Sequence, residues 1–428
     1  MTTPFARSAL ALLFASVACA ADWPHWRGPA RDGTTTEASG FAPGTAWPAD
    51  MPQWSAKLGE GSSSPLVVGG TLFAPGWSDG KDTLRALSTK DGKVLWAQSY
   101  KCPRYGRFHT GDEGLYGGPS ATPEFDPATK LLYTLSTDGD LNCWDTSNAG
   151  KRAWGLNLYD EFKTERRPKL TKAPQRDYGY TCAPLVHKDW VLVEVGSVKT
   201  GSVVAFDKRT GKRAWASELK DEAGHTGGMA PMTIEGVPCV AVVTQRHLAA
   251  IRLDAGKEGA TAAKFEWVTD FANTIAGPAV SGDCALVTSA YNMNALCKVR
   301  FTLTEAKEEW RAKFPSKVCT PVIHDGSVYV AWQRVRCLDW NTGERKWEGG
   351  AFGDPGSCAV TSDGRVIVYG LNGKLALIEG AARAPKEYTE LAVRDRLFRT
   401  HAWPHVALSG GVLYLRDRDG NLMALAVK

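Results

Sequence analysis

The chain has 428 residues, including 44 glycines and 16 tryptophans, and 43% of its residues are hydrophobic. Its formal net charge of +5 at pH 7 is too small for a surface dedicated to nucleic acid. The hydrophobic fraction supports a large core, and β architectures can hold more than about 200 residues in one domain. We therefore expect a globular protein that does not bind nucleic acid.

The first 20 residues predict an export signal. A short apolar run over 9–17 follows one basic residue, and a small-x-small cleavage site stands directly before Ala21. The run is too short for a membrane-spanning helix, and no later stretch of the sequence reaches the required length. Lipidation at Cys19 is the alternative, but Ser16 stands where lipoprotein signals carry a larger aliphatic residue. The sequence therefore favours removal of residues 1–20 and a periplasmic or secreted protein over a lipid anchor.

Residues 21–50 contain no repeated phrase and predict an extended N-terminal segment. Beyond it, one phrase recurs, most clearly as VVAFDKRTGKRAW at 203–215 and VRCLDWNTGERKW at 335–347. Looser copies are LRALSTKDGKVLW at 84–96 and LNCWDTSNAGKRAW at 141–154. The alternation of apolar residues predicts a β-strand, and the glycine of the turn is free to adopt positive φ. The tryptophan then belongs to the next strand, where its ring can fill the space between neighbouring sheets.

The tryptophan that ends each phrase sets the period of the repeat. Its spacing runs from 37 to 61 residues, which is typical of a four-stranded propeller blade with variable loops. Tyr388 takes the slot that follows the last of these tryptophans. The tryptophans that we expect to pack between blades, as structural docking residues, are Trp54, Trp96, Trp154, Trp215, Trp267, Trp310 and Trp347.

The number of strands predicts how the ring closes. Each tryptophan strand is followed by a strand that opens with a small residue and usually proline, and there are eight strands of each kind. The first tryptophan strand, 51–58, precedes every such opening strand, whereas the last three strands, near 404–408, 412–416 and 421–427, lack a fourth. We therefore predict an all-β, eight-bladed β-propeller with four-stranded antiparallel blades over residues 51–428. The N-terminal strand completes the C-terminal blade and closes the ring.

The phrase at 203–215 resembles the tryptophan-docking repeat of the pyrroloquinoline-quinone (PQQ) propellers, and the resemblance covers roughly residues 51–428. That superfamily contains quinoprotein dehydrogenases and the non-catalytic lipoprotein of the outer-membrane protein assembly machinery. The resemblance therefore implies a fold without fixing a function. The segment DWPHWRGPARDG at 22–33 is similar to the opening of many PQQ-like repeat proteins from planctomycete-type bacteria. The residues that match the repeat are Ala205, Asp207, Thr210, Gly211 and Trp215.

The dehydrogenases of that superfamily hold PQQ beside Ca²⁺ bound by Glu, Asn and Asp side chains, and the alcohol-oxidising branch carries two adjacent cysteines. This chain has no adjacent cysteine pair, and no spacing groups its carboxylates as ligands. We therefore expect no catalytic residue, no metal and no cofactor, and favour a non-catalytic scaffold that binds a protein or ligand in the cell envelope. A PQQ- and calcium-dependent alcohol or aldose dehydrogenase stays open as the alternative, and a carbohydrate-binding propeller as the second.

Two long links between blades, 99–120 and 159–181, carry the candidate partner surface. They mix arginine with aromatic residues, which suits recognition of an envelope protein, a peptide or a glycan, and solvated loops without a partner are the alternative. We expect a monomer, and by the repeat register we expect aromatic and imidazole side chains to line the channel mouth. The loop arginines are Arg104, Arg107, Arg166 and Arg167, and the channel-mouth residues are Tyr116, Tyr178, Tyr180, His225, Trp403 and His405.

Overall fold

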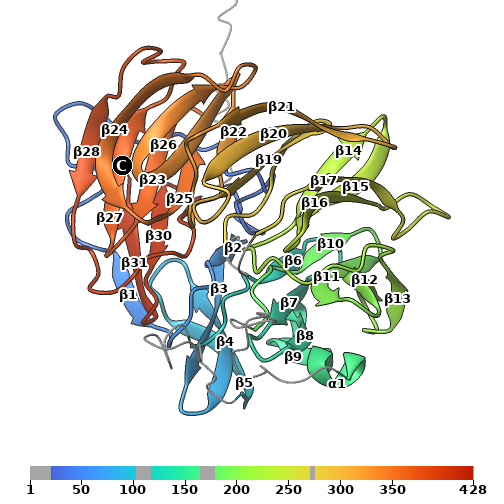
Figure 1. The fold of residues 1–428 in the computed structure, drawn as a ribbon. Coiled ribbons are helices and arrows are strands. Elements are labelled where there is room, and N and C mark those ends of the chain that lie inside the picture. The colour runs from blue at the N-terminus through green and yellow to red at the C-terminus, as the bar shows by residue number, and fades with distance from the viewer. Residues whose placement is uncertain (1–20, 103–116, 164–178, 270–274, 428) are drawn as a thin grey trace, which may run out of the picture.

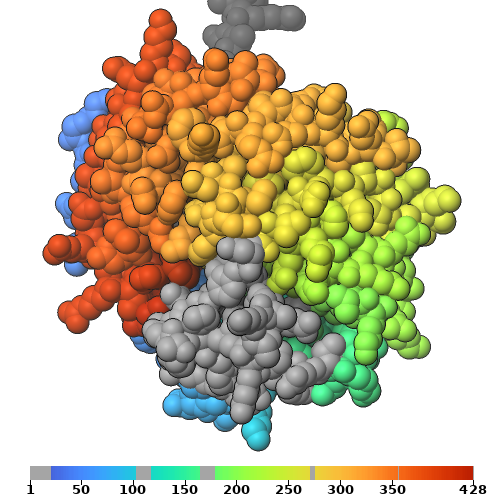
Figure 2. Space-filling view, viewed as in Figure 1, coloured from blue at the N-terminus to red at the C-terminus, as the bar shows by residue number. Residues whose placement is uncertain are grey.

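The computed structural model describes residues 21–102, 117–163, 179–269 and 275–427. In these residues, β-strands form eight antiparallel sheets that stand around a common axis as the blades of a propeller (Figure 1). In the space-filling view the colours run around the molecule in chain order, so successive blades occupy neighbouring sectors (Figure 2). The predicted all-β, eight-bladed propeller with four-stranded antiparallel blades is confirmed.

Blades 1 to 4 each consist of four consecutive strands, beginning with the strand nearest the axis. Blade 1 comprises β2 (Leu66–Val68), β3 (Thr71–Ser78), β4 (Lys81–Ser88) and β5 (Val94–Lys101). Blade 2 comprises β6 (Glu124–Asp126), β7 (Leu131–Leu135), β8 (Asp140–Asp145) and β9 (Lys151–Asn157). Blade 3 comprises β10 (Leu185–His187), β11 (Trp190–Ser197), β12 (Gly201–Asp207) and β13 (Arg213–Ala216). Blade 4 comprises β14 (Ala230–Ile234), β15 (Val237–Val243), β16 (His247–Arg252) and β17 (Thr261–Glu266).

Blades 5 to 8 complete the ring. Blade 5 comprises β18 (Ala279–Ser281), β19 (Cys284–Ser289), β20 (Ala295–Phe301) and β21 (Ala306–Ala312). Blade 6 comprises β22 (Val322–His324), β23 (Ser327–Asp339) and β24 (Arg345–Gly353), where β23 pairs with β22 through its first residues and with β24 through its later ones. Blade 7 comprises β25 (Pro355–Val360), β26 (Arg365–Gly370), β27 (Lys374–Glu379) and β28 (Glu390–Arg394). Blade 8 comprises β29 (Ala407–Ser409), β30 (Val412–Arg416), β31 (Asn421–Ala426) and β1 (Trp54–Lys57).

The helical elements of the described residues are η1 (Thr146–Asn148) and α1 (Leu158–Phe162), both of which adjoin blade 2. No helix within the described ranges has the length and apolar character that a membrane crossing requires.

Closure of the ring follows the prediction. Strand β1 from the N-terminal part of the chain pairs antiparallel with β31 from the C-terminal part, with Trp54 opposite Ala424 and Lys57 opposite Asn421. The side chains that β31 buries, Leu422, Ala424 and Leu425, are at most 1% exposed. One blade is thus built from the two ends of the chain, which leaves no unpaired seam between blades 8 and 1.

The repeated phrase fixes each blade to the next through its tryptophan and its glycine. In blade 2, the indole Nε1 of Trp154 donates a hydrogen bond to the carbonyl of Lys208 in the β12–β13 turn of blade 3, at 3.1 Å. Gly211 of the same turn lies against this indole, and the contact is so close that a Cβ added to Gly211 would stand 2.6 Å from the ring. Trp54 and Trp310 make the same donation to Thr89 and Trp340 in the blades that follow theirs.

Gly211→Ala is expected to cost about 1–3 kcal/mol of unfolding free energy, because a methyl group would meet both a φ of +71° and the Trp154 ring. Gly236→Ala is the matched control, since Gly236 has a φ of +80° and no neighbouring atom within 4 Å of the added Cβ. Urea titrations of the two variants should show the larger loss at Gly211. Equal losses would mean that backbone conformation alone selects the glycine.

The register corrects two of the predicted docking positions. In blades 1, 2, 3, 5 and 6 the pairing of the third and fourth strands contains a β-bulge, and the tryptophan stands opposite the third-strand residue that precedes it, as Trp215 stands opposite Ala205. In blade 4 this place belongs to Ala263, opposite Ala250, and Trp267 lies beyond the end of β17, fully buried between blades 4 and 5. In blade 7 the place belongs to Ala392, opposite Leu377. Trp267 and Tyr388 therefore do not hold the register place of the repeat, because the connections into the fourth strands of these blades are longer than in the repeat phrase. Trp267 still packs between blades, as predicted.

Tyr388 nevertheless packs between blades. Its ring lies 6.0 Å from that of Trp347 at an interplanar angle of 66°. Trp347 in turn donates a hydrogen bond to the carbonyl of Ala384, at 3.0 Å. The loop that carries Ala384 and Tyr388 therefore takes the place of the Thr-Gly turn in blade 7.

Residues 21–50 run from the axis of the propeller to the closing blade. Near the start, Trp23 bridges to Val67 in β2 of blade 1, and Thr34 bridges to Val360 in β25 of blade 7. We call residues 22–33 the axial segment, because they contact the inner strands of several blades. The segment and the residue after it are thereby held by blades 1 and 7, which lie far apart in the sequence and have only blade 8 between them in the ring.

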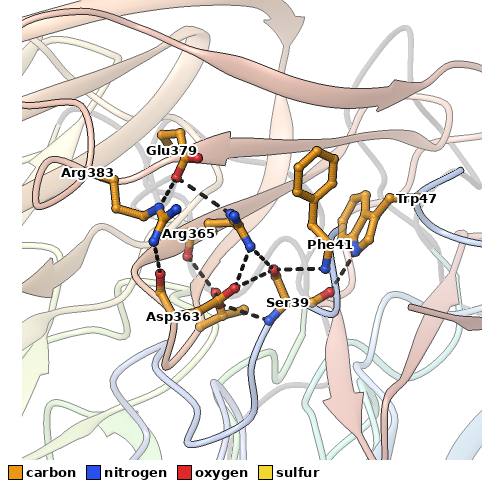
Figure 3. A network of polar contacts seen from close by, with 8 residues as sticks. Ser39, Phe41, Trp47, Asp363, Arg365, Glu379 and Arg383 are labelled. Carbon is orange, nitrogen blue, oxygen red and sulfur yellow. Dashed lines mark hydrogen bonds and ion pairs between the residues drawn. The ribbon is translucent and has the colours of Figure 1, made fainter. Parts of the chain in front are cut away.

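The rest of this stretch is tied to blades 7 and 8. Ser39 donates through its backbone N and its hydroxyl to the Asp363 carboxylate, at 2.9 and 2.7 Å, and its carbonyl accepts the indole N–H of Trp47 (Figure 3). The guanidinium of Arg365 bonds the same carboxylate and lies 5.0 Å from the ring of Phe41. This network fixes the path of the chain into β1, the strand that closes the ring.

Candidate ligand-binding site

A pocket lies on the propeller axis, where the chain enters the innermost strand of each blade. Its volume is about 120 Å³, and all eight blades contribute to its wall. We call it the axial pocket. Its lining residues are Trp26, Ser62, Ser64, Ser120, Thr181, His225, Gly227, Ile275, Val318, Thr320, Gly356, Trp403 and His405.

Trp26 comes from the axial segment rather than from a blade, and its position is fixed by glycines. A Cβ added to Gly228 would lie 2.3 Å from the indole, and one added to Gly277 would lie 2.6 Å from it. These glycines precede the inner strands of blades 4 and 5. Because they have no side chains, they leave the space that the indole fills. The ring of His405 meets Trp26 edge-on, with centroids 5.5 Å apart and an interplanar angle of 64°.

Two hydroxyl groups of the wall already accept hydrogen bonds from the backbone. Ser64 Oγ accepts from the backbone N of His405 at 2.7 Å, and Thr320 Oγ1 accepts from the backbone N of Gly277 at 2.9 Å. Thr181 donates its hydroxyl proton to the carbonyl of Thr226 at 3.2 Å. The wall therefore offers a ligand a small number of hydrogen bonds at fixed places.

The pocket is uncharged in the part of the chain that the structure describes. Its lining there includes no Asp, Glu, Lys or Arg side chain. Burial, together with the positive charge of nearby Arg27, lowers the pKa of His405 to about 3, so its imidazole is neutral at any physiological pH. A ligand in the pocket therefore meets no formal charge from these residues.

Polar contacts behind the pocket hold the axial segment in place. Arg27 is fully buried and donates to the carbonyls of Asp32 and Pro321, and burial lowers its pKa to about 10. Glu124 of β6, which is 2% exposed, binds the His25 ring at 2.9 Å and also the Arg31 guanidinium. The segment carrying Trp26 is thus fastened by blades 2 and 6.

The structure brings together three of the six predicted channel-mouth residues. His225, Trp403 and His405 all line the axial pocket. Tyr180 does not, because it is 1% exposed and packs edge-on against Tyr159 with centroids 5.0 Å apart. The remaining predicted site residues lie outside the described residues: Tyr116, Tyr178, Arg104, Arg107, Arg166 and Arg167.

Sequence reasoning missed Trp26 and the hydroxyls of the wall. The density of aromatic residues in the DWPHWRG stretch was the available signal for Trp26, but the stretch lies outside the repeats, so the register gave it no position. The hydroxyls stand two to four residues before the inner strands, where the repeat pattern assigned them no role.

A family model described as outer membrane protein assembly factor BamB matches residues 114–349, which is more than half of the chain. The chain belongs to this family. The predicted resemblance to the PQQ-like repeat proteins is therefore confirmed. Among solved structures, BamB from Moraxella catarrhalis superposes on this BamB-family chain with a TM-score of 0.61 at 12% identity. The superposition covers 87% of this chain and 98% of that one, and shows the shared fold.

Curated relatives of this BamB-family protein are quinone-dependent dehydrogenases and a kinase. The dehydrogenase subunit of alcohol dehydrogenase (quinone) from Komagataeibacter europaeus is 28% identical over 171 residues, which is 38% of this chain and 21% of that protein. The serine/threonine-protein kinase AfsK from Streptomyces griseus is 36% identical over 124 residues, which is 27% of this chain and 15% of the kinase. The matched part of the chain thus spans about a fifth or less of the length of these relatives.

The quinone enzymes raise the question of whether this pocket could hold PQQ and Ca²⁺. Ca²⁺ takes six to eight oxygen ligands, with carboxylates prominent among them. The described lining residues supply no carboxylate, and the described residues contain no group of three or more His, Cys, Asp or Glu side chains arranged for a metal ion. They also supply no cation to pair with the carboxylates of PQQ. The residues present in the pocket do not fit this cofactor, and we derive no step through it.

Proposed function

We propose that this BamB-family propeller is an exported, non-catalytic scaffold that binds a partner or ligand in the cell envelope, with the axial pocket as its recognition site. The observation that carries the proposal is the lining of the pocket, which is aromatic, imidazole and hydroxyl in character and uncharged among the described residues. Such a set can hold a ligand by stacking and hydrogen bonding. Quinoprotein chemistry would require a cation and a carboxylate base at the same place.

The family description supports an envelope protein or peptide as the partner, because BamB is described as an outer membrane protein assembly factor. A glycan is the other partner class that aromatic and hydroxyl side chains suit.

A contact at the start of the described chain supports export with removal of residues 1–20. Ala21 N donates to Glu37 Oε1 at 2.9 Å, and the Glu37 carboxylate also accepts hydrogen bonds from the backbone of Gly410 and Gly411 in blade 8. Cleavage before Ala21 would place an ammonium group against this carboxylate, and a charge-assisted bond is stronger than one to a neutral amide. This favours cleavage over lipidation at Cys19, and the intact mass of the exported chain tests it.

The proposal is tested against the dehydrogenase alternative, which the 28% identity to the alcohol dehydrogenase subunit motivates. Isothermal titration with PQQ in the presence of CaCl₂ is expected to show no binding tighter than about 1 mM. A dye-linked assay with ethanol and glucose should give no reduction above the protein-free rate. A PQQ-dependent dehydrogenase reconstituted in the same buffer serves as the positive control. Micromolar binding accompanied by dye reduction would move the protein to the enzyme class.

A further inference from the structure

We propose that the axial pocket takes one uncharged aromatic ring, of the phenyl or phenol type, against Trp26. This inference rests on the proposed binding function and names the chemistry that the site selects. The ring can belong to an aromatic side chain of a protein partner or to a free phenol, and the chemistry that the pocket recognises is the same in both cases.

The size of the pocket sets the first limit. A cavity of about 150 Å³ lined by apolar side chains is known to admit benzene, and the axial pocket has a volume of about 120 Å³. The space therefore matches a single six-membered ring. A fused tricyclic quinone is too large to be enclosed by it.

The walls favour an aromatic ring in that space. Trp26, Trp403, Ile275 and Val318 present apolar surface to the pocket from the axial segment and from blades 8, 5 and 6. Aromatic pairs gain from edge-on and offset contacts at centroid separations of about 4.5–7 Å, and Trp26 already makes such a contact with His405. The indole of Trp26 packs directly against the backbone of Gly228 and Gly277, so it cannot move away from the pocket. Its exposed part is therefore a preformed surface for a ring.

Charge excludes the corresponding acids and amines. An ion that enters the pocket loses its hydration, and the described lining gives it no opposite charge in return. The neutral His405 ring cannot supply a positive charge near neutral pH, because burial holds its pKa far below that range. A benzoate-type ligand should therefore be rejected even though its ring has the right size.

Hydrogen bonding separates a phenol from a sugar. A hexose ring carries several hydroxyl groups, and each one that is buried without a partner costs binding free energy. The wall carries five hydroxyl groups, those of Ser62, Ser64, Ser120, Thr181 and Thr320, and three of them already make an internal hydrogen bond. They are spread over several blades, so each hydroxyl of a hexose would have to meet one of these fixed positions. A single phenolic hydroxyl is within this capacity.

The test is a titration of the full exported chain with four small probes, followed by tryptophan fluorescence and by ligand-observed NMR. The probes are p-cresol, N-acetyl-tyrosinamide, p-toluate and methyl glucoside. p-Cresol is expected to bind saturably with a Kd of about 1 mM or tighter. p-Toluate and methyl glucoside should each bind at least about tenfold more weakly.

N-acetyl-tyrosinamide binding at least tenfold tighter than p-cresol identifies a protein side chain as the source of the ring. Equal or weaker binding of that probe identifies a free phenol.

Two variants locate the site. Ser120→Phe and Ser62→Phe each place a ring at the pocket wall, on side chains that are partly exposed, and should weaken p-cresol binding at least about tenfold. Ser55→Phe on the exposed side of β1 is the matched control and should leave the affinity unchanged. Thermal melts check that each variant remains folded.

The inference is overturned if p-cresol does not bind, if methyl glucoside or p-toluate binds more tightly, or if both blocking variants keep the native affinity. These outcomes are distinct from failure of the proposed function. That failure would appear as PQQ binding with dye reduction, whatever p-cresol does.

Discussion

Trp347→Ala is expected to lower the free energy of unfolding by about 3–5 kcal/mol. The Trp347 side chain is 5% exposed, donates its indole N–H to Ala384 in blade 7, and lies between the rings of Tyr329 and Tyr388. Truncation to alanine therefore removes a large buried ring, leaves a cavity between blades 6 and 7, and leaves the Ala384 carbonyl without its donor.

Urea titration followed by tryptophan fluorescence and circular dichroism measures this loss. Trp347→Phe keeps a six-membered ring in this space, and loses the hydrogen bond together with only the smaller, pyrrole part of the indole. It should cost about 1–2 kcal/mol. Trp215→Ala is the matched comparison in blade 3, where the indole is only partly buried and its Nε1 makes no hydrogen bond among the described residues. A loss below about 1 kcal/mol for Trp347→Ala would show that the tryptophan is not a structural contact between blades.

Deletion of residues 421–428 is expected to abolish the cooperative thermal transition and leave the protein aggregated. Strand β31 pairs with β30 on one side and with β1 on the other, so its removal exposes the facing edges of both strands. It also removes Leu422, Ala424 and Leu425, which are essentially inaccessible to solvent. Unpaired edges next to exposed apolar side chains promote association between chains.

Size-exclusion chromatography with light scattering and a thermal melt provide the measurement. Deletion of Lys428 alone is the control, and it should leave a monomer with the melting temperature of the full chain. A truncated protein that lacks 421–428 but keeps an unchanged melting curve would contradict the closure of the ring by β1 and β31.

The fold could be predicted from the sequence because most blades carry a recognisable motif within a short stretch of the chain. A turn glycine followed by a tryptophan recurs in blades 1, 2, 3 and 6, and the count of strands placed Trp54 in the C-terminal blade, where β1 is found. The same reasoning misplaced Trp267 and Tyr388, since spacing alone cannot show where a longer connection shifts the register. A repeat therefore predicts which strands exist more reliably than which residue occupies a given position in each.

The axial pocket could be predicted only in part. His225, Trp403 and His405 precede inner strands, so the repeat register brought them to the axis. Trp26 could not be placed in this way. It rests against Gly228 and Gly277, about 200 and 250 positions further along the chain, and no local pattern links these residues. Glycines that make room for a distant ring look the same in the sequence as glycines that make turns.

The N-terminal stretch also has a consequence for the time at which the protein can fold. Glu37 is held by the backbone of Gly411, 374 positions away, and Ser39 by Asp363, 324 positions away. Export from the N-terminus, as proposed above, would present these residues first and their partners last. Contacts of such sequence separation form slowly, because a long loop must be closed before they stabilise anything. Glu37 and Ser39 therefore cannot make these contacts until blades 7 and 8 have been delivered, whereas Trp23 can bridge to blade 1 much earlier.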